Sequence, residues 1–424
     1  MAFWDIQARI PRDLDDWRAS IREACRWAAE RSMMRGVECA VADGAFEHAG
    51  RYRDWRGAFR GEYSAATKRW DVYAPIWHGG QGVKGLAYAA RALGEAQWLD
   101  AAEYAAGFLL RHQIVDAGDE DRGLLLAYEN DHINVSAIVE ALDGLLVLGE
   151  VSGQTRYAEA AVAAARWVVR KAYRPEDGSF RAVYDPDARR FAPPRRLADG
   201  RAFDGSPLLD DGVWVKVHRL TGERDFLDVA VCVAERLLAD EDPPGNWAKF
   251  PPNDPVTRTC HPRTAYWCGR PLWMVAQTTG DERFLACARR SASWYVQAMR
   301  LDGGLFRSTA PDFKTPSFDH ATSGIACAAI LWLELAQEYG NTEWDQHLAR
   351  ALRYCYAMQF AAVSDENLQG AVLEKVVAPN GRDAPPWYLR DIGTFFYIQA
   401  ASRALAERPS VLQLEPVAVT ANGA

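Results

Sequence analysis

The chain has 424 residues, of which 49% are hydrophobic and 25% are charged, and its formal net charge at pH 7 is −8. These fractions are ordinary for a globular protein, while the acidic balance and the lack of a basic stripe argue against a nucleic-acid partner. No stretch contains the roughly 18 uncharged apolar residues that a membrane-spanning helix needs. The first residues lack the features of a secretion signal, and the eight cysteines lack CxxC spacing, which favours a reducing compartment. We therefore expect a cytoplasmic protein with no membrane partner.

The two ends of the chain are each predicted to hold one helix. The first covers residues 11–34, with acidic residues in its first turns, where the helix dipole favours them. Residues 36–75 follow as an irregular segment rich in glycine, arginine and aromatic residues. The last helix covers residues 388–406, before Pro409 and a polar tail. Neither helix has a sequence neighbour to pair with, so we expect them to pair with each other.

Between the terminal helices, a turn of one glycine, three mostly polar residues and one aromatic residue occurs five times. The five copies are Gly94–Trp98, Gly153–Tyr157, Gly222–Phe226, Gly280–Phe284 and Gly340–Trp344. A strongly apolar segment precedes each copy, and a segment with one charged face follows it. Such a turn joins two antiparallel helices by a short loop, and its regular return marks a repeat architecture. The repeating unit is therefore predicted to be a helical hairpin.

The helices of the five hairpins can be placed by their pattern. The first helices are expected over residues 78–93, 133–152, 206–221, 262–279 and 318–339, and the second helices over residues 98–115, 155–173, 225–239, 284–300 and 344–361. Residues 137–149 and 325–335, within two of the first helices, are apolar nearly all round, so the first helices should be buried and form an inner ring. With the terminal pair as a sixth hairpin, the prediction is an all-α (α/α)6 toroid. It forms a single domain over residues 1–407, followed by a tail over residues 408–424.

The long connections between hairpins contain a second recurring pattern. Each holds a glycine followed by alternating apolar and polar residues, beginning at Gly123, Gly178, Gly245, Gly304 and Gly370. This alternation predicts short β-strands in the long loops on one face of the ring.

Polar and aromatic residues gather where each long connection leads into an inner helix. Four of the eight histidines lie at these six points, namely His78, His132, His261 and His320. A closed ring would direct all six points to one place at its axis, on loops held by a rigid scaffold. Carboxylates, imidazoles, arginines and aromatic rings gathered there suit a polyhydroxy ligand and acid–base chemistry.

Individual roles can be assigned within this set. We expect the catalytic carboxyl groups to come from Glu129, Asp204 and Asp319, with His132, His261 and His320 as proton carriers or hydrogen-bond donors. The expected substrate-binding residues are Trp77, His78, Gln81, Asp131, Asp211, Trp247, Arg263, Tyr266, Trp387, Tyr388, Arg390 and Asp391. The alternative for an acidic residue at a helix start is simple capping, and for a histidine or aromatic residue it is a structural contact.

The hairpin period, the turns, the loop strands and the polar inner-helix starts together resemble the six-hairpin glycosidase superfamily over most of residues 70–406. That group includes unsaturated glucuronyl hydrolases, sugar 2-epimerases and related lyases and C5-epimerases. Residues 259–306 loosely resemble the unsaturated glucuronyl hydrolases. His261 and Arg263 stand where that family has an aspartate-led motif, and its later serine-to-arginine-glycine motif is reduced to Thr322-Ser323-Gly324.

The resemblance implies a carbohydrate-active enzyme that needs no cofactor, most simply a glycoside hydrolase acting on a short oligosaccharide, with a uronic acid among the candidate sugars. One protonated carboxyl would act as general acid and a second carboxylate would activate water, about 6.5–9.5 Å away in an inverting enzyme. Arg263 and Arg390 would bind a substrate carboxylate by paired hydrogen bonds. The alternatives are a uronic-acid epimerase or lyase, and a toroid that only binds a glycan or a protein.

A metal site is not expected. Cys260 and His261 are adjacent and Cys268 is near, but Cys268 would lie in the same helix as His261, and the spacing does not match a zinc site. The sugar, the linkage and the oligomeric state are left open by the sequence.

Overall fold

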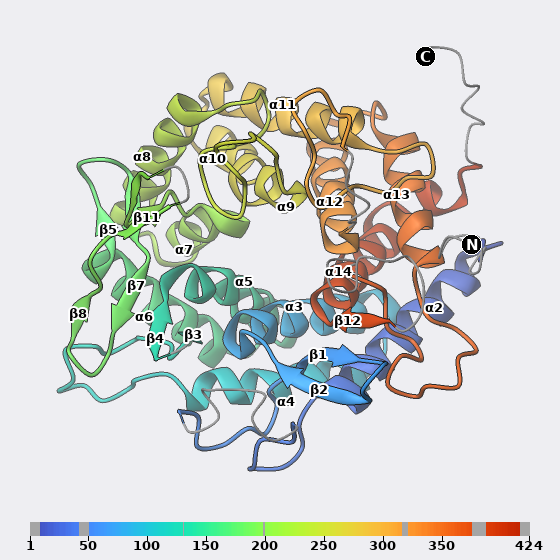
Figure 1. Ribbon diagram of the computed structural model, residues 1–424, viewed down its shortest axis with the longest axis horizontal. Coiled ribbons are helices and arrows are strands. Elements are labelled where there is room, and N and C mark those ends of the chain that lie inside the picture. Colours follow the sequence, from blue (N-terminus) through green and yellow to red (C-terminus); the bar gives the residue numbers. More distant parts are fainter. Residues whose placement is uncertain are drawn as a thin grey trace.

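The computed structural model describes residues 9–41, 51–129, 131–197, 200–315, 321–374 and 387–415. These segments form two concentric rings of helices around one axis (Figure 1). The inner helices are α3 (Pro75–Leu93), α5 (Val135–Ser152), α7 (Val213–Thr221), α10 (Leu272–Thr279), α12 (Thr322–Tyr339) and α14 (Ile392–Glu407). Each inner helix or its first turns contacts the next, and α14 returns to α3, so the ring is closed.

The outer ring consists of the second helices of the hairpins. They are α4 (Ala96–Arg111), α6 (Thr155–Lys171), α8 (Arg224–Asp240), α11 (Glu282–Ala298) and α13 (Asp345–Ala357), and α2 (Leu14–Trp27) with its continuation η1 (Ala28–Ser32) completes the set. Helix α2 packs against α14, where the Ser20 hydroxyl lies 2.5 Å from the Tyr397 hydroxyl. The two ends of the chain therefore meet as a sixth hairpin.

The five predicted glycine turns end the inner helices. Gly94, Gly153, Gly222, Gly280 and Gly340 all have φ between 62° and 77°. This left-handed conformation suits glycine because it has no Cβ. The inner helices are buried almost all round; in α12 every residue from Thr322 to Ala336 is buried. The predicted (α/α)6 arrangement, with apolar first helices inside and amphipathic second helices outside, is confirmed.

Three inner helices differ clearly from their predicted bounds. The last one, expected over 388–406, begins only at Ile392, because residues 388–390 form a strand instead. The helix expected over 206–221 begins at Val213, after a single 3-10 turn, η2 (Asp210–Gly212). Pro207 and the left-handed backbone of Asp211 and Gly212 prevent an earlier start. The helix expected over 262–279 is divided into α9 (Pro262–Thr264), η3 (Ala265–Gly269) and α10, because Pro271 interrupts its hydrogen-bond ladder.

Short antiparallel sheets lie on the face of the long connections. One sheet has the order β12-β1-β2, with β12 (Tyr388–Arg390), β1 (Gly61–Ser64) and β2 (Arg69–Val72). A second has the order β3-β4-β7-β8, with β3 (Tyr128–Glu129), β4 (His132–Asn134), β7 (Val183–Asp185) and β8 (Arg190–Phe191). The others are β11-β6-β5, with β11 (Gly205–Ser206), β6 (Ser179–Arg181) and β5 (Tyr173–Arg174), and the pair β10 (Ala202–Phe203) with β9 (Arg195–Arg196).

The strands agree only in part with the predicted ones. Strands β3, β6 and β7 follow Gly123 and Gly178 as expected. After Gly245, Gly304 and Gly370 the described chain forms only isolated bridges, such as Asp242 with Trp247 and Gln359 with Val372. Strands β1 and β2 lie in the segment that was expected to be irregular.

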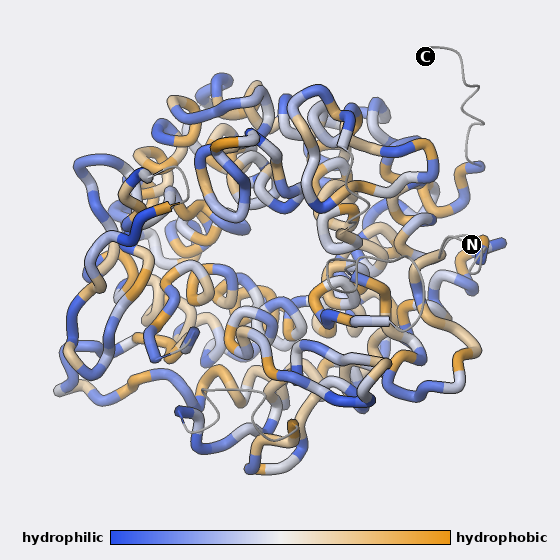
Figure 2. The backbone as a smooth tube through the Cα atoms, in the orientation of Figure 1, coloured by the Kyte–Doolittle hydropathy of each residue, from blue (hydrophilic) through white to orange (hydrophobic). Residues whose placement is uncertain are grey.

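The distribution of polarity follows the two rings. Hydrophilic stretches occur on the outer surface and also on segments that border the centre of the ring (Figure 2). Among the described helices none combines the length and the apolar character needed to cross a bilayer. The apolar core therefore lies between the rings, while hydrophilic segments border the axis.

Candidate active site

A belt of charged side chains spans the axis of the inner ring. We call it the axis belt; its members are Lys84, Asp143, Asp211, Lys216, Arg270, Glu334 and Arg403. The Lys84 ammonium lies 3.1 Å from an Asp143 oxygen and 2.9 Å from an Asp211 oxygen. Arg270 binds Asp211 and donates two hydrogen bonds to Glu334, of 2.6 and 2.5 Å.

The axis belt extends to the remaining inner helices. Arg403 of α14 donates to Glu334 at 2.5 Å, and Lys216 of α7 donates to Asp143. Positive and negative groups alternate, so each belt member meets an opposite charge. Burial lowers the pKa of Lys84, but Asp211 and Asp143 more than offset this and raise it to about 12. The belt is thus a network of opposite charges that ties all six inner helices together.

One helical turn nearer the long connections lies a second group, which we call the site cluster. Its members are Trp77, Glu140, Asp210, Arg263 and Trp267. Residues three or four positions apart share one face of a helix. Glu140 therefore lies on the same face of α5 as Asp143, one turn nearer the long connections. In the same way, Arg263 and Trp267 of the α9–η3 segment share a face with Arg270.

Arg263 is the central member of the site cluster. Its guanidinium carbon lies 5.3 Å from the centre of the Trp77 ring and 5.2 Å from that of Trp267, so the cation is held between two aromatic rings. The residue is only 4% exposed. Within the described chain no ion pair joins Arg263 to a carboxylate, and its Nε and Nη1 have no hydrogen-bond partner. The Trp77 indole nitrogen is likewise buried without a partner among those residues.

Two carboxyl groups of the site cluster are shifted towards their protonated forms. Burial raises the pKa of Glu140, the neighbouring Asp210 raises it further, and the Arg263 charge opposes the rise. Glu140 accepts a hydrogen bond of 3.1 Å from the Trp267 indole. Burial also raises the pKa of Asp210, to about 8, with a further contribution from the charge of Asp211. At neutral pH the pair therefore retains a proton that it can donate.

The adjacent Asp210 and Asp211 belong to different layers. Asp211 has φ 54°, and its carboxylate accepts from the Tyr266 hydroxyl at 2.7 Å as well as from Lys84 and Arg270. Of the residues expected to bind substrate, Asp211 and Tyr266 are thus engaged with the axis belt. Gln81 lies between the layers, where its amide donates to the Glu140 carbonyl at 3.0 Å.

A second polar group links the first turns of α3 and α14. His78 Nδ1 lies 2.5 Å from an Asp391 carboxylate oxygen, and both side chains are fully buried. The Ser32 hydroxyl donates to the other Asp391 oxygen at 3.3 Å. Burial raises the pKa of Asp391 although His78 and Ser32 oppose the rise. His78 Nε2 has no hydrogen-bond partner among the described residues.

The predicted residues of β12 are already bound within the protein. The Arg390 guanidinium and the Tyr388 hydroxyl both donate to Glu62 of β1, and Arg390 also lies 4.0 Å above the Tyr73 ring. Arg390 is therefore paired, unlike Arg263. Trp387 is half-buried and packs against the hydrophobic core.

The remaining predicted residues lie away from the site cluster. Glu129 and Asp131 are exposed on the β3–β4 hairpin, Glu129 pairs in register with His132, and Asp131 forms an ion pair of 3.2 Å with Arg51. Asp204 forms an ion pair of 2.5 Å with Arg174 in a hollow of about 240 Å³ between strands at the rim.

Trp247 and His261 have structural contacts. Trp247 is fully buried and its indole donates to the Leu237 carbonyl at 2.8 Å, so its ring has no face open to a sugar. His261 Nδ1 accepts from the Arg263 backbone amide at 3.1 Å, which caps α9 and leaves the proton of the neutral ring on Nε2. Its ring stacks on Trp267. Asp319 and His320 lie outside the described residues.

The chain matches no protein-family model, and no curated protein matches it in sequence. Solved structures do match. The cellobiose 2-epimerase from Bacillus thermoamylovorans B4167 has a TM-score of 0.63 at 10% identity, over 92% of this chain and 100% of that chain. The unsaturated glucuronyl hydrolase from Bacillus sp. GL1 has a TM-score of 0.62 at 15% identity, over 92% and 99%. The family 76 mannosidase from Bacteroides thetaiotaomicron VPI-5482 has a TM-score of 0.63 at 10% identity, over 92% and 98%.

The chain has the fold of the six-hairpin glycosidase superfamily. The resemblance inferred from its turns and hairpins is thereby confirmed. At these identities the likeness concerns the fold, so the chemistry of this six-hairpin toroid has to be argued from its own residues.

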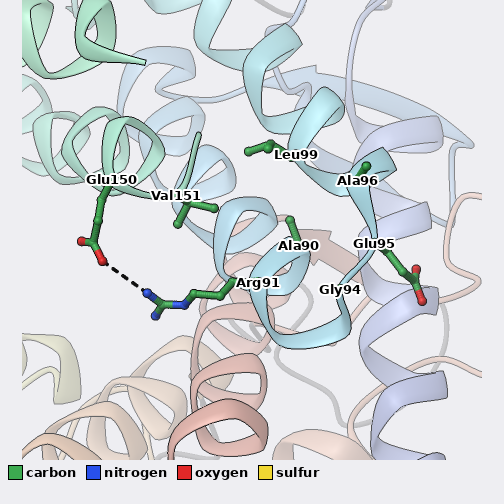
Figure 3. A pocket seen from close by; sticks show the side chains of 8 residues that line it. All are labelled: Ala90, Arg91, Gly94, Glu95, Ala96, Leu99, Glu150 and Val151. Carbon is green, nitrogen blue, oxygen red and sulfur yellow. Dashed lines mark hydrogen bonds and ion pairs between the residues drawn. The ribbon is translucent and has the colours of Figure 1, made fainter. Parts of the chain in front are cut away.

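One hollow of the toroid lies on the opposite face from the site cluster. It has a volume of about 350 Å³ and lies between the ends of α3, α4 and α5 near the first glycine turn (Figure 3). Arg91 and Glu150 form an ion pair of 3.3 Å across it. Its lining residues end α3, whereas Trp77 begins that helix, so the hollow does not belong to the site.

Three members of the toroid's site cluster were not predicted: Glu140, Asp210 and Trp267. Glu140 lies in a helix that reads as apolar nearly all round, and an acidic residue in such a helix is itself a signal, because burying a charge is costly. Among the described residues no three His, Cys, Asp or Glu side chains are grouped so as to hold a metal ion.

Proposed function

We propose that the protein is a carbohydrate-active enzyme, a glycoside hydrolase that acts on a short oligosaccharide containing a uronic acid. The observation that carries this proposal is the buried guanidinium of Arg263, which has no acidic partner in the described chain and lies between two tryptophans. Next to it is Glu140, a carboxyl with a raised pKa.

Glu140 and Asp210 are the proposed acid–base pair. Both are buried, and their charges act on each other, so the pair titrates as a unit and loses its protons in two steps. In the singly protonated state one carboxyl gives its proton to the glycosidic oxygen as the bond to the anomeric carbon breaks. The other, ionised, carboxylate takes a proton from the water whose oxygen bonds to that carbon.

Arg263 is the proposed site for the substrate carboxylate. A buried cation without a counter-ion is unfavourable, and a ligand carboxylate would supply the missing charge and two hydrogen-bond acceptors. The flanking Trp77 and Trp267 offer aromatic surface for a sugar ring. Arg390, which was expected to share this role, is already bound to Glu62. We therefore assign the substrate carboxylate to Arg263 alone.

The test is hydrolysis of short oligosaccharides that end in a uronic acid, each paired with the neutral hexose counterpart, measured as new reducing ends. Glu140→Gln should lower kcat about 10²- to 10⁴-fold, because the proton donor is lost while the hydrogen bond from Trp267 can remain. The matched control is Glu150→Gln on the same helix, whose carboxylate is on the opposite face and which should keep wild-type turnover.

Other outcomes would assign the chemistry elsewhere. Full turnover in Glu140→Gln together with loss of turnover in Glu129→Gln would refute the Glu140–Asp210 pair. It would assign the general acid to Glu129 on the β3–β4 hairpin. A lyase would instead give an unsaturated product, seen as new ultraviolet absorbance, and no water would be incorporated into the products. Binding of the oligosaccharide without any turnover, unchanged in Glu140→Gln, would show a non-catalytic glycan-binding toroid.

A uronic-acid or sugar epimerase is the second candidate, and one observation favours it. The buried His78–Asp391 pair orients an imidazole whose Nε2 has no partner in the described chain, an arrangement suited to removing a proton from carbon. Incubation in deuterated water would distinguish the two functions. Deuterium incorporated into intact sugar, with loss of exchange in His78→Gln, would establish the epimerase and overturn the hydrolase.

A further inference from the structure

The two neighbouring acids Asp210 and Asp211 have different surroundings. We propose that Asp211 is a positioning residue for the reaction: the axis belt holds its carboxylate, and this fixes the η2 turn that sets Asp210 beside Glu140. The proposal rests on the proposed function, in which Asp210 and Glu140 form the acid–base pair.

Asp211 is held by two different inner helices. From α3, the Lys84 ammonium donates to Oδ2 at 2.9 Å. From η3, the Tyr266 hydroxyl donates to Oδ1 at 2.7 Å and Arg270 binds the same oxygen. Asp211 is 1% exposed. Three donors on a buried carboxylate leave it a single orientation, and charged hydrogen bonds of this kind are the strong ones.

The backbone of the η2 turn needs such an anchor. Asp211 has φ 54° and ψ 10°, a left-handed conformation that is unfavourable for a residue with a Cβ. Gly212 follows with φ 66°, and a Cβ there would lie 2.4 Å from the Met274 sulfur. The turn is thus confined by the belt on one side and by α10 on the other. Strain that surrounding contacts maintain is typical of functional sites.

The anchored carboxylate also acts on Asp210 through its charge. Burial raises the pKa of Asp211, but Lys84, Arg270 and Lys216 outweigh it and hold the pKa below its usual range. Asp211 therefore stays ionised, and its negative charge favours the protonated form of Asp210. The other charged or titratable groups around Asp210 are Glu140 on α5, Lys84 on α3 and Cys268 on η3.

Asp143 offers a matched control. It is 1% exposed and binds the same Lys84, at 3.1 Å, and also Lys216. It lies within the regular helix α5, one turn below Glu140, and supports no strained turn. A purely structural role for belt acids would make the two aspartates equivalent, whereas a positioning role distinguishes Asp211.

The experiment compares Asp211→Asn with Asp143→Asn by thermal unfolding and by the pH dependence of kcat/KM on the uronic-acid substrate. We expect both variants to unfold at lower temperature than the wild type. Only Asp211→Asn should lower kcat, by about 10²-fold with a smaller change in KM, and move the alkaline limb of the profile to lower pH. The shift has this sign because loss of the Asp211 charge, with Lys84 and Arg270 left in place, makes the last proton of the pair easier to remove.

Equal kcat and identical pH profiles in the two variants would overturn the positioning role while leaving the hydrolase intact. Wild-type turnover in Asp210→Asn would instead refute the proposed function itself. If Asp211→Asn fails to fold, Tyr266→Phe carries the test, since it removes one donor to Asp211 and keeps every charge. Its kcat should fall about 3- to 10-fold with an unchanged KM, and an unchanged kcat would overturn the positioning role.

Discussion

In the axis belt every charged side chain meets an opposite charge, whereas one helical turn away the site cluster buries a guanidinium with none in the described chain. The charged groups of both layers are largely buried, and both layers draw on α3, α5, η2 and the segment that leads into α10, so position alone does not explain the difference. The belt satisfies its charges within the protein and holds the ring together. The site cluster leaves hydrogen-bond donors for a ligand, as a preorganised binding site does.

The largest effect should come from breaking the belt at Lys84. Lys84→Met leaves Asp211 without one of its cations and Asp143 with only Lys216, and removing one partner from a buried ion network costs about 3–5 kcal/mol. Denaturant unfolding should show a midpoint lowered accordingly. A loss below about 1 kcal/mol would mean that the belt charges are not energetically coupled, and the contrast with the site cluster would fail.

The belt should also set the acid limit of stability, through Glu334. Burial raises the pKa of Glu334, but the charges of Arg270 and Arg403 outweigh it and bring the pKa from 4.5 to about 2. A depressed pKa means stabilisation that is fully present above pH 4.5 and is lost as the pH falls through 2, by about 3 kcal/mol in total.

The measurement is the unfolding free energy of the wild type and of Glu334→Gln between pH 6 and pH 2. The wild type should lose stability across this window, while the variant, less stable throughout, should lack that part of the slope. Parallel curves would show that Glu334 does not titrate with folding.

The smallest effect on stability should come from the site cluster. Arg263→Met removes a buried cation that has no acidic partner in the described chain and keeps an unbranched chain between the two tryptophan rings, so unfolding should change by no more than about 1 kcal/mol. Binding should respond instead: kcat/KM for the uronic-acid substrate should fall about 10- to 100-fold, with little change for the neutral counterpart. Severe destabilisation with equal losses on both substrates would show that Arg263 is structural.

Much of the architecture follows from local pattern, as the turn glycines illustrate. Each of the five ends an inner helix in the predicted left-handed conformation, because glycine tolerates it. The aromatic residue of each turn lies in the first turn of the next helix or directly before it. The terminal pairing of α2 with α14 was also predictable, because neither helix has a partner nearby in the sequence.

The site was predictable only at the helix starts. Trp77 and Arg263 were expected to approach each other and do so, as do His78 and Asp391. The acids were assigned to loop residues such as Glu129, because an acidic residue before a helix is conspicuous. A spacing signal existed for the deeper groups: Lys84, Asp143 and Arg270 each lie ten residues before a turn glycine, and Glu140 and Trp267 each lie thirteen before one.

The sequence by itself determined the hairpin period and the division into inner and outer helices, because helical spacing and turn chemistry act over a few residues. Only the tertiary structure decided which charges are paired. Lys84 meets Asp143 and Asp211 across 59 and 127 residues, and Arg390 finds Glu62 across 328. Such pairs form only when the closed ring brings six helices to one axis, and the same closure leaves Arg263 without a pair in the described chain.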